Sequence, residues 1–134
     1  MCKLIIIIIH KKKNWFNMQI KQKPWGKEII YAHDNGLYIG KIIHIKKGSR
    51  LSLQDHIHKH ETFFLDTGSA EVLLNGKKYS VSDTDSLEKR VFVVQPHKKH
   101  RIIAIKDCIF LEVSTDHPDD VRRYKDDYGR KNID

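Results

Sequence analysis

Cysteine is scarce in this chain of 134 residues. The two cysteines, Cys2 and Cys108, lie far apart in the sequence and form no CxxC pair. A disulfide framework or a thiolate metal site needs several cysteines at short, regular spacing. The composition therefore argues against both classes and favours a reducing compartment, for which the cytoplasm is the default expectation.

Long hydrophobic runs are also missing. The longest one, Leu4–Ile9, is much shorter than the roughly 20 apolar residues that a membrane-spanning helix requires. It is also short for a signal peptide, and no small-residue cleavage site follows it. We therefore expect neither a membrane anchor nor a secretion signal.

The first 17 residues differ in composition from the rest of the chain. They contain four lysines and no acidic residue, and so carry half of the formal net charge of +8. We interpret residues 1–17 as an extension upstream of a natural start at Met18, with an extra edge strand as the alternative. Residues 18–134 are then a single domain. No basic face with aromatic platforms and no recognition helix is evident, so nucleic acid is not an expected partner.

From Lys27 onward the chain alternates between short strands and turns. Asp34-Asn35-Gly36 and Asn75-Gly76 are strong turn signals, each between two β-rich runs. The predicted strands span residues 27–33, 37–45, 61–66, 70–74, 77–81, 91–94, 101–105 and 109–113. Such spacing predicts an all-β sandwich or barrel. Pro118, with acidic neighbours before residues 121–127 and Gly129 after them, predicts one short C-terminal helix.

Residues of types that commonly bind metals are concentrated in one short stretch. They are Gln54, His56, His58, His60 and Glu61. If residues 51–58 are extended, the period of two places the apolar side chains of Leu51, Leu53 and Ile57 on one face and the polar ones on the other. A further ligand from a distant strand is then expected, and His100 is the candidate. Nitrogen and oxygen ligands without thiolate suit zinc, manganese, iron, cobalt or nickel.

At these residues the chain resembles a known family. The spacing of Gly48, Gln54-x-His56, Glu61 and Gly68 is similar to the first cupin motif, and Gln-x-His resembles the zinc site of phosphomannose isomerases, so zinc ranks first among the metals. RLSLQ-x-H-x-H-x-x-E, Pro24-Trp25-Gly26 and the segment 119–130 resemble the C-terminal cupin domain of type II mannose-6-phosphate isomerases. The resemblance covers about residues 23–130. It implies a cupin-type double-stranded β-helix, that is, a jelly-roll barrel.

The second cupin motif departs from the family pattern. It normally reads Pro-x-Gly-x-x-His, whereas residues 95–100 read QPHKKH and keep only the final histidine. We therefore rank the expected metal ligands as His56, Glu61 and His100 first, Gln54 next and His58 last.

The resemblance implies a metal-dependent aldose-ketose isomerase that converts mannose 6-phosphate to fructose 6-phosphate in polysaccharide or nucleotide-sugar precursor synthesis. Glu61, His58 or a lysine is then the catalytic base. The expected phosphate-binding residues are Arg50, Lys59, Arg101 and Arg130. An ordinary solvated rim is the alternative for Lys59 and Arg101, and surface salt bridges with neighbouring aspartates are the alternative for Arg130.

Other functions and partners stay open at this point. One is a non-catalytic sugar-binding partner of a separate nucleotidyltransferase, because type II enzymes are often fused to a mannose-1-phosphate guanylyltransferase. Another is a cupin epimerase or oxygenase acting on a different small substrate. We also expect a homodimer that buries the face carrying Leu51, Leu53 and Ile57.

Overall fold

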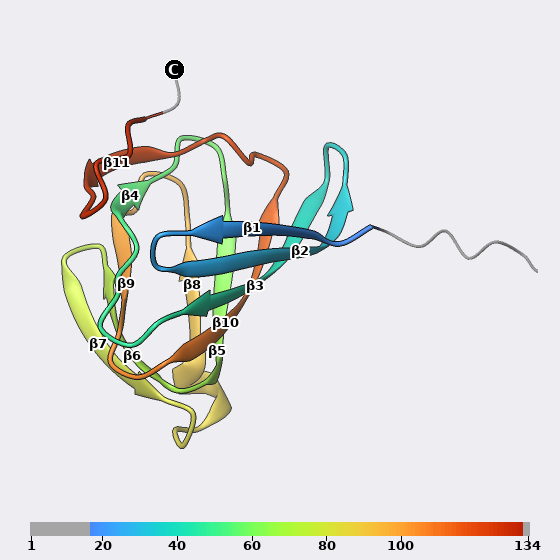
Figure 1. The fold of residues 1–134 in the computed structure, drawn as a ribbon. Coiled ribbons are helices and arrows are strands. Elements are labelled where there is room, and N and C mark those ends of the chain that lie inside the picture. The colour runs from blue at the N-terminus through green and yellow to red at the C-terminus, as the bar shows by residue number, and fades with distance from the viewer. Residues whose placement is uncertain (1–16, 133–134) are drawn as a thin grey trace, which may run out of the picture.

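Two antiparallel sheets pack face to face in the computed structural model, which describes residues 17–132 (Figure 1). The six-stranded sheet contains, in spatial order, β1 (Gln19–Lys23), β2 (Gly26–Asp34), β3 (Tyr38–Ile45), β10 (Cys108–Thr115), β5 (Glu61–Thr67) and β8 (Val91–Val94). The five-stranded sheet contains β11 (Arg122–Lys125), β4 (Leu53–Asp55), β9 (His100–Ala104), β6 (Ser69–Leu74) and β7 (Lys77–Ser82). A 3-10 turn, η1 (Leu87–Arg90), precedes β8. This architecture confirms the predicted all-β jelly-roll barrel.

Turn chemistry explains the predicted hairpins. Asn75 and Gly76 both have positive φ, 49° and 82°, as a two-residue hairpin turn with the right twist requires. They join β6 to β7 in continuous register from Leu74↔Lys77 to Ser69↔Ser82. The turn after Asp34 likewise joins β2 to β3. The strands that the sequence predicted therefore form, with ends that differ by a few residues.

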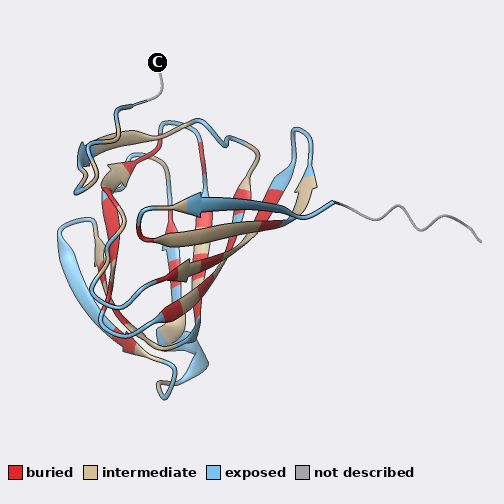
Figure 2. Cartoon of the chain, in the orientation of Figure 1, coloured by how far each residue is buried: buried red, intermediate tan, exposed pale blue. Residues whose placement is uncertain are grey.

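The core lies between the two sheets (Figure 2). Along β5 and β10 every second residue is buried, so Phe63, Leu65 and Phe110 point inward. Leu65 and Phe110 are fully buried, which stabilises the fold by roughly 1.5–3 kcal/mol for each side chain. Burial, followed by the negative charge of Asp107, raises the pKa of the Cys108 thiol to about 12. Cys108 is therefore a core residue rather than a reactive thiol.

The predicted C-terminal helix is wrong. Residues 122–125 form the strand β11, which pairs with β4. Its alternate residues Arg122 and Tyr124 both bind the buried carboxylate of Asp55, at 2.8 Å for each of two guanidinium nitrogens and 3.1 Å for the phenol. Residues two apart share a face in a strand but not in a helix. Satisfying Asp55 therefore favours the strand over the local helix signals.

The segment that carries the predicted ligands is only partly a strand. The β-structure covers Leu53–Asp55, and the chain bends after it. Leu51 packs against the core, whereas Ile57 is 42% exposed, so the apolar face predicted for residues 51–57 does not form. The homodimer that was expected to bury this face stays a prediction.

Two expectations concern the ends of the chain and the membrane. The prediction that residues 1–17 are an extension falls almost entirely outside the described residues. Within residues 17–132, no helix has the length and apolar character needed to cross a bilayer.

Candidate metal centre and cavity

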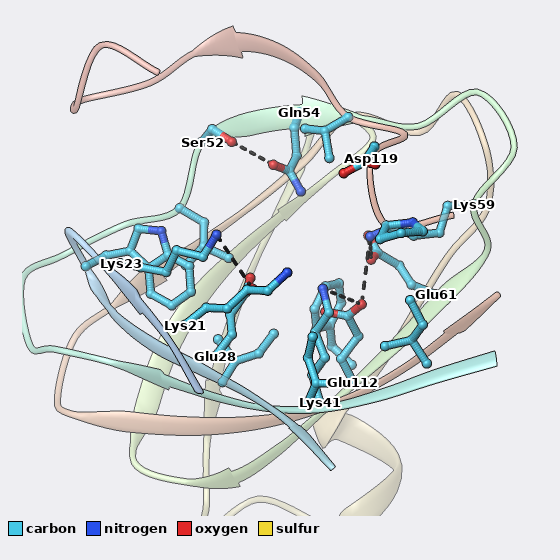
Figure 3. A pocket seen from close by; sticks show the side chains of 18 of the residues that line it. Lys21, Lys23, Glu28, Lys41, Ser52, Gln54, Lys59, Glu61, Glu112 and Asp119 are labelled. Carbon is cyan, nitrogen blue, oxygen red and sulfur yellow. Dashed lines mark hydrogen bonds and ion pairs between the residues drawn. The ribbon is translucent and has the colours of Figure 1, made fainter. Parts of the chain in front are cut away.

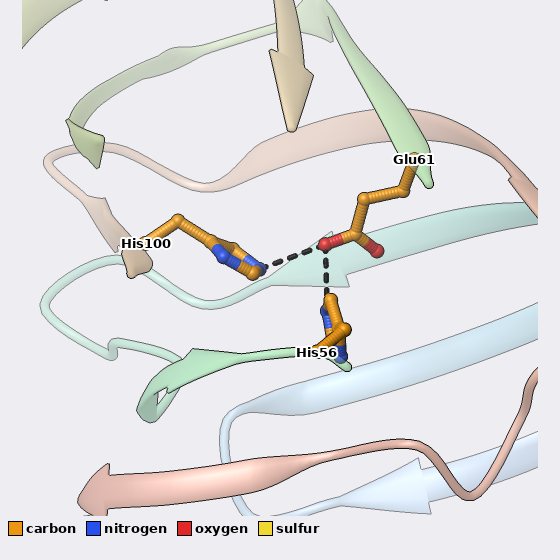
Figure 4. A group of neighbouring side chains, drawn as sticks. All are labelled: His56, Glu61 and His100. Carbon is orange, nitrogen blue, oxygen red and sulfur yellow. Dashed lines mark hydrogen bonds and ion pairs between the residues drawn. The ribbon is translucent and has the colours of Figure 1, made fainter. Parts of the chain in front are cut away.

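Three predicted ligands from separate parts of the chain meet inside the barrel (Figure 4). His56 follows β4, Glu61 begins β5 and His100 begins β9. Oε1 of Glu61 lies 2.8 Å from Nε2 of both histidines, and all three side chains are buried. Among the described residues this is the one group of histidine, cysteine or carboxylate side chains that could hold a metal ion.

Backbone carbonyls determine which nitrogen of each imidazole faces the centre. Nδ1 of His56 contacts the carbonyl of Asp120, and Nδ1 of His100 contacts the carbonyl of Lys98 at 2.9 Å. Because a carbonyl only accepts, each Nδ1 carries the proton, and in the neutral ring Nε2 presents a lone pair. The Nε2 lone pairs of both histidines then face the negative carboxylate of Glu61. A cation or an extra proton is needed to offset the repulsion between them. The donor set fits a divalent metal ion, with the second-shell contacts typical of such sites.

Asp120 fixes the loop that carries His56. Its carboxylate accepts hydrogen bonds from the backbone N–H groups of Ile57, His58 and Lys59, at 2.9, 2.6 and 2.8 Å. Burial by itself would raise the pKa of Asp120, but these three donors outweigh it and lower the pKa to about 2. The same residue therefore closes the bend after β4 with its side chain and orients the His56 ring with its carbonyl.

We expect Asp120→Ala to weaken metal binding by up to about 10–100-fold, because it keeps the carbonyl at His56 but releases the loop that positions the His56 ring. The loss of three backbone partners should also lower the free energy of unfolding by about 1–3 kcal/mol. Metal titration and urea unfolding measure the two effects. The matched control is Asp107→Ala, which removes one loop hydrogen bond to Lys47 N and should leave metal affinity unchanged. Equal metal affinity in both variants would contradict this role.

The other two predicted ligands lie differently. Gln54 is paired in register with His100 on the neighbouring strand, and its Oε1 accepts a hydrogen bond of 2.6 Å from Ser52. It is adjacent to the group and lines the same cavity as Glu61. His58 is exposed, and its ring lies against that of His117, with 5.7 Å between centroids. It lies outside the His56–Glu61–His100 group, so we leave it out of the proposed ligand and catalytic sets.

A buried lysine joins the metal group to a second carboxylate. Nζ of Lys59 lies 2.8 Å from Oε2 of Glu61 and 3.8 Å from Oε1 of Glu112. Burial would lower the pKa of Lys59, but the carboxylates of Glu112 and Glu61 outweigh it, so the pKa is raised. For Glu61, the effect of burial is outweighed first by the positive charge of Lys59, and the pKa is held well below its usual range. The pair is therefore ionised.

A cavity of about 250 Å³ lies beside Glu61 between the two sheets (Figure 3). This is smaller than the roughly 300–1,000 Å³ of pockets for drug-sized ligands, which suits a small metabolite. Its lining includes five cationic side chains, namely Lys21, Lys23, Lys41, Lys59 and Arg130. It also includes four carboxylates, namely Glu28, Glu61, Glu112 and Asp119.

The residues predicted to bind phosphate separate into two groups. Lys59 and Arg130 line the cavity, and Arg130 is also paired with Asp126, with 2.7 Å between its Nη2 and Oδ1. Arg50 instead forms an ion pair with Asp127, at 2.6 and 2.9 Å, and Arg101 donates to the backbone carbonyls of Leu51 and Lys125. Neither arginine lines the cavity, so both act in this structure as supports for the segment around β11.

Several cavity residues were not predicted from the sequence. Lys41 and Glu112 were not singled out, and Lys21 and Lys23 lie on β1, which was not predicted as a strand. A signal for two of them was present. Lys41 alternates in phase with the buried Ile39 and Ile43, and Glu112 is in phase with Phe110. A charged residue at an inward position of a strand marks a functional candidate.

Two antiparallel sheets packed face to face with a His–Glu–His cluster between them are typical of a cupin. A family model described as the mannose-6-phosphate isomerase C-terminal domain matches residues 10–126 of the chain. The chain belongs to this family, as the resemblance of its motifs indicated.

Individual relatives agree with this assignment. The mannose-1-phosphate guanylyltransferase of Escherichia coli is 30% identical over 114 residues, which cover 81% of this chain and 23% of that protein. The chain thus spans about a quarter of the length of this relative.

Solved structures share the fold at lower identity. KdgF from Halomonas sp. superposes with a TM-score of 0.63 and 21% identity, over 78% of this chain and 89% of KdgF. The capsular polysaccharide assembling protein CapF from Staphylococcus aureus gives a TM-score of 0.62 and 16% identity, over 87% of this chain and 32% of CapF. At these identities the likeness shows the cupin fold alone.

Proposed function

We propose that this chain is a metal-dependent sugar-phosphate isomerase that interconverts mannose 6-phosphate and fructose 6-phosphate. The observation that carries the proposal is the shared position of Glu61, which belongs both to the His–Glu–His group and to the wall of the basic cavity. A sugar bound in the cavity would therefore lie beside the metal centre. The family to which the chain belongs supports the choice of reaction.

The charge of the cavity supports a phosphorylated substrate. Lys23, Lys41 and Arg130 are 27%, 13% and 23% exposed at their side chains, so each is partly withdrawn from water. Charge-assisted hydrogen bonds to a phosphate are stronger in such surroundings than at an open surface. Together with Lys21 and Lys59 these residues outnumber the carboxylates of the cavity. A bound divalent cation would add further positive charge.

The reaction requires stabilisation of negative charge on a carbonyl oxygen while a proton moves between C2 and C1. A divalent cation held by His56, Glu61 and His100 would polarise that oxygen or bind adjacent hydroxyls. The chain itself supplies the cationic residues that orient the phosphate. Phe63 and Ile43 form an apolar part of the wall that limits the access of water.

A coupled assay of mannose 6-phosphate conversion tests the proposal. The protein starts at Met18, is stripped of metal and is reloaded separately with zinc, manganese, cobalt or nickel. We expect turnover to depend on the metal and to fall by at least 100-fold in His56→Ala, because that variant loses a ligand. Absence of turnover with every metal would overturn the isomerase proposal.

A second candidate is a sugar-phosphate-binding partner of a nucleotidyltransferase without chemistry of its own. The name of the Escherichia coli relative, of which the chain spans a quarter, favours it. In that case mannose 6-phosphate should raise the melting temperature of the metal-loaded protein although the coupled assay shows no turnover.

A further inference from the structure

We propose that Glu112 is the catalytic acid-base residue that carries the proton between C2 and C1 of the sugar phosphate. This inference rests on the proposed isomerase function and names the group that performs its central step.

The structure argues against the bases that the sequence suggested, including a lysine, because Lys59 is held as a cation between Glu61 and Glu112. Oε1 of Glu61 is 2.8 Å from two imidazoles and its Oε2 is 2.8 Å from Lys59, so both oxygens are engaged. His58 is exposed and lies against His117. The proton-transfer group must therefore be sought elsewhere in the cavity wall.

Burial separates Glu112 from the remaining cavity carboxylates. Asp119 is exposed, and Glu28 is half-buried and forms an ion pair of 3.7 Å with Lys23. Glu112 is 3% exposed and lies on β10, between β3 and β5 in the six-stranded sheet. Of the carboxylates on the described cavity wall, it is the buried one outside the metal group.

The contacts of Glu112 leave it free to accept a proton. Its Oε1 is buried and has no hydrogen-bond partner among the described residues. Oε2 of Glu61 has none either, but that oxygen lies only 2.8 Å from Lys59 Nζ. Two cations flank this oxygen at ion-pair distance, Lys41 Nζ at 3.6 Å and Lys59 Nζ at 3.8 Å (Figure 3). A buried carboxylate with a purely structural role normally has its oxygens hydrogen-bonded. Here the lysines balance the charge, and the lone pairs remain available to a ligand.

Lys59 connects this carboxylate to the metal group. The same ammonium lies beside Oε2 of Glu61 and Oε1 of Glu112, so the two acids face one part of the cavity. A sugar whose carbonyl oxygen lies at the metal centre would then place its neighbouring carbon toward Glu112.

The proposed step balances as follows. The Glu112 carboxylate takes the proton from C2, the C2–H electron pair forms the C1=C2 double bond, and the C1 carbonyl electrons move onto O1. The proton of the C2 hydroxyl passes to O1. Glu112 then returns its proton to C1 as the carbonyl forms at C2, which regenerates the carboxylate. No oxidant, reductant or further reactant is consumed.

The test is Glu112→Gln, which keeps the shape of the side chain and removes its basicity. General acid-base catalysis contributes typically 10²–10⁴-fold, so we expect kcat to fall by about that factor. The KM for mannose 6-phosphate and the bound-metal content should stay within about threefold of wild type. The affinity for mannitol 6-phosphate, which has no carbonyl and cannot react, should also be retained. The control is Glu71→Gln, which breaks a surface ion pair with Lys78 and should leave kcat unchanged.

Each outcome has a defined meaning. Wild-type protein without turnover overturns both the isomerase and this inference. Wild-type turnover that persists within tenfold in Glu112→Gln overturns the inference alone, and so does a variant that loses metal or mannitol 6-phosphate affinity, because its role is then structural. If Glu112→Gln does not fold, Glu112→Asp keeps the charge between the lysines but withdraws the carboxylate by one methylene. It should lower kcat more than tenfold at unchanged metal content, and an unchanged kcat overturns the proposal.

Discussion

His100→Ala is expected to bind a divalent metal at least 100-fold more weakly than the wild-type chain. The substitution removes one of the three ligands that converge within 4.8 Å of one another and leaves the Glu61 carboxylate with fewer partners in a buried site. Loss of a direct ligand should exceed the 10–100-fold cost of losing a second-shell contact. Lys59 remains 2.8 Å from Glu61, so we expect the barrel to stay folded while metal binding fails.

Competition with a chelator measures the affinity, and circular dichroism checks the fold. His33→Ala is the control, because His33 also contacts a carboxylate, with 2.9 Å between its Nε2 and Asp116 Oδ1, but is only partly buried. It lies outside the metal group and should keep wild-type affinity. Equal metal binding by His100→Ala and wild type would rule out the site. Loss in both variants would point to general destabilisation instead.

Two of the three proposed metal ligands are close in the sequence, whereas the third is brought to them by the pairing of distant strands. His56 and Glu61 are five positions apart, so their proximity follows from one bend in the chain. His100 is brought to them by the register of β4 and β9, in which it lies opposite Gln54. The sequence identified His100 through the strand before it and through a motif that keeps only its histidine. That all three meet at one carboxylate oxygen depends on carbonyl contacts from Asp120 and Lys98, which no local pattern reveals.

Long-range contacts also explain where the sequence patterns were misleading. Pro118, acidic neighbours and Gly129 are real helix signals, but they were outweighed by Asp55, more than 60 positions away in sequence, which takes both Arg122 and Tyr124. Propensity is weak compared with a buried carboxylate that needs partners. Arg50 and Arg101 were expected at the substrate for their charge alone, yet nearby acceptors engage both. Strand alternation would have been the better guide, because it places Lys41 and Glu112 inside.

Gly26→Ala is expected to lower the free energy of unfolding by about 4 kcal/mol or more. Single substitutions cause losses of this size only through a few mechanisms, among them backbone strain and steric clashes. Gly26 has φ of +152°, which side chains rarely adopt, and an added Cβ would lie 1.9 Å from the carbonyl oxygen of His44. Gly26 lies on β2 and the clashing carbonyl lies in the backbone of the paired strand β3, so β2 would have to move away from β3. Urea unfolding measures the loss. Gly36→Ala is the control, because φ is also positive, +79°, but nothing lies within 4 Å, so only about 1 kcal/mol is expected.

Gly26→Ala should also affect sugar binding in the cavity. Gly26 follows Trp25, which is 2% exposed and lines the cavity beside Lys23. The backbone carbonyl of Trp25 also accepts a hydrogen bond of 2.9 Å from Lys46 N. Displacing β2 would therefore move Trp25 and Lys23 together, so any Gly26→Ala protein that still folds should bind mannose 6-phosphate less tightly. Its metal affinity should change little, since the proposed ligands lie on or next to β4, β5 and β9. A folded variant with unchanged sugar affinity would show that the Pro-Trp-Gly turn serves stability alone.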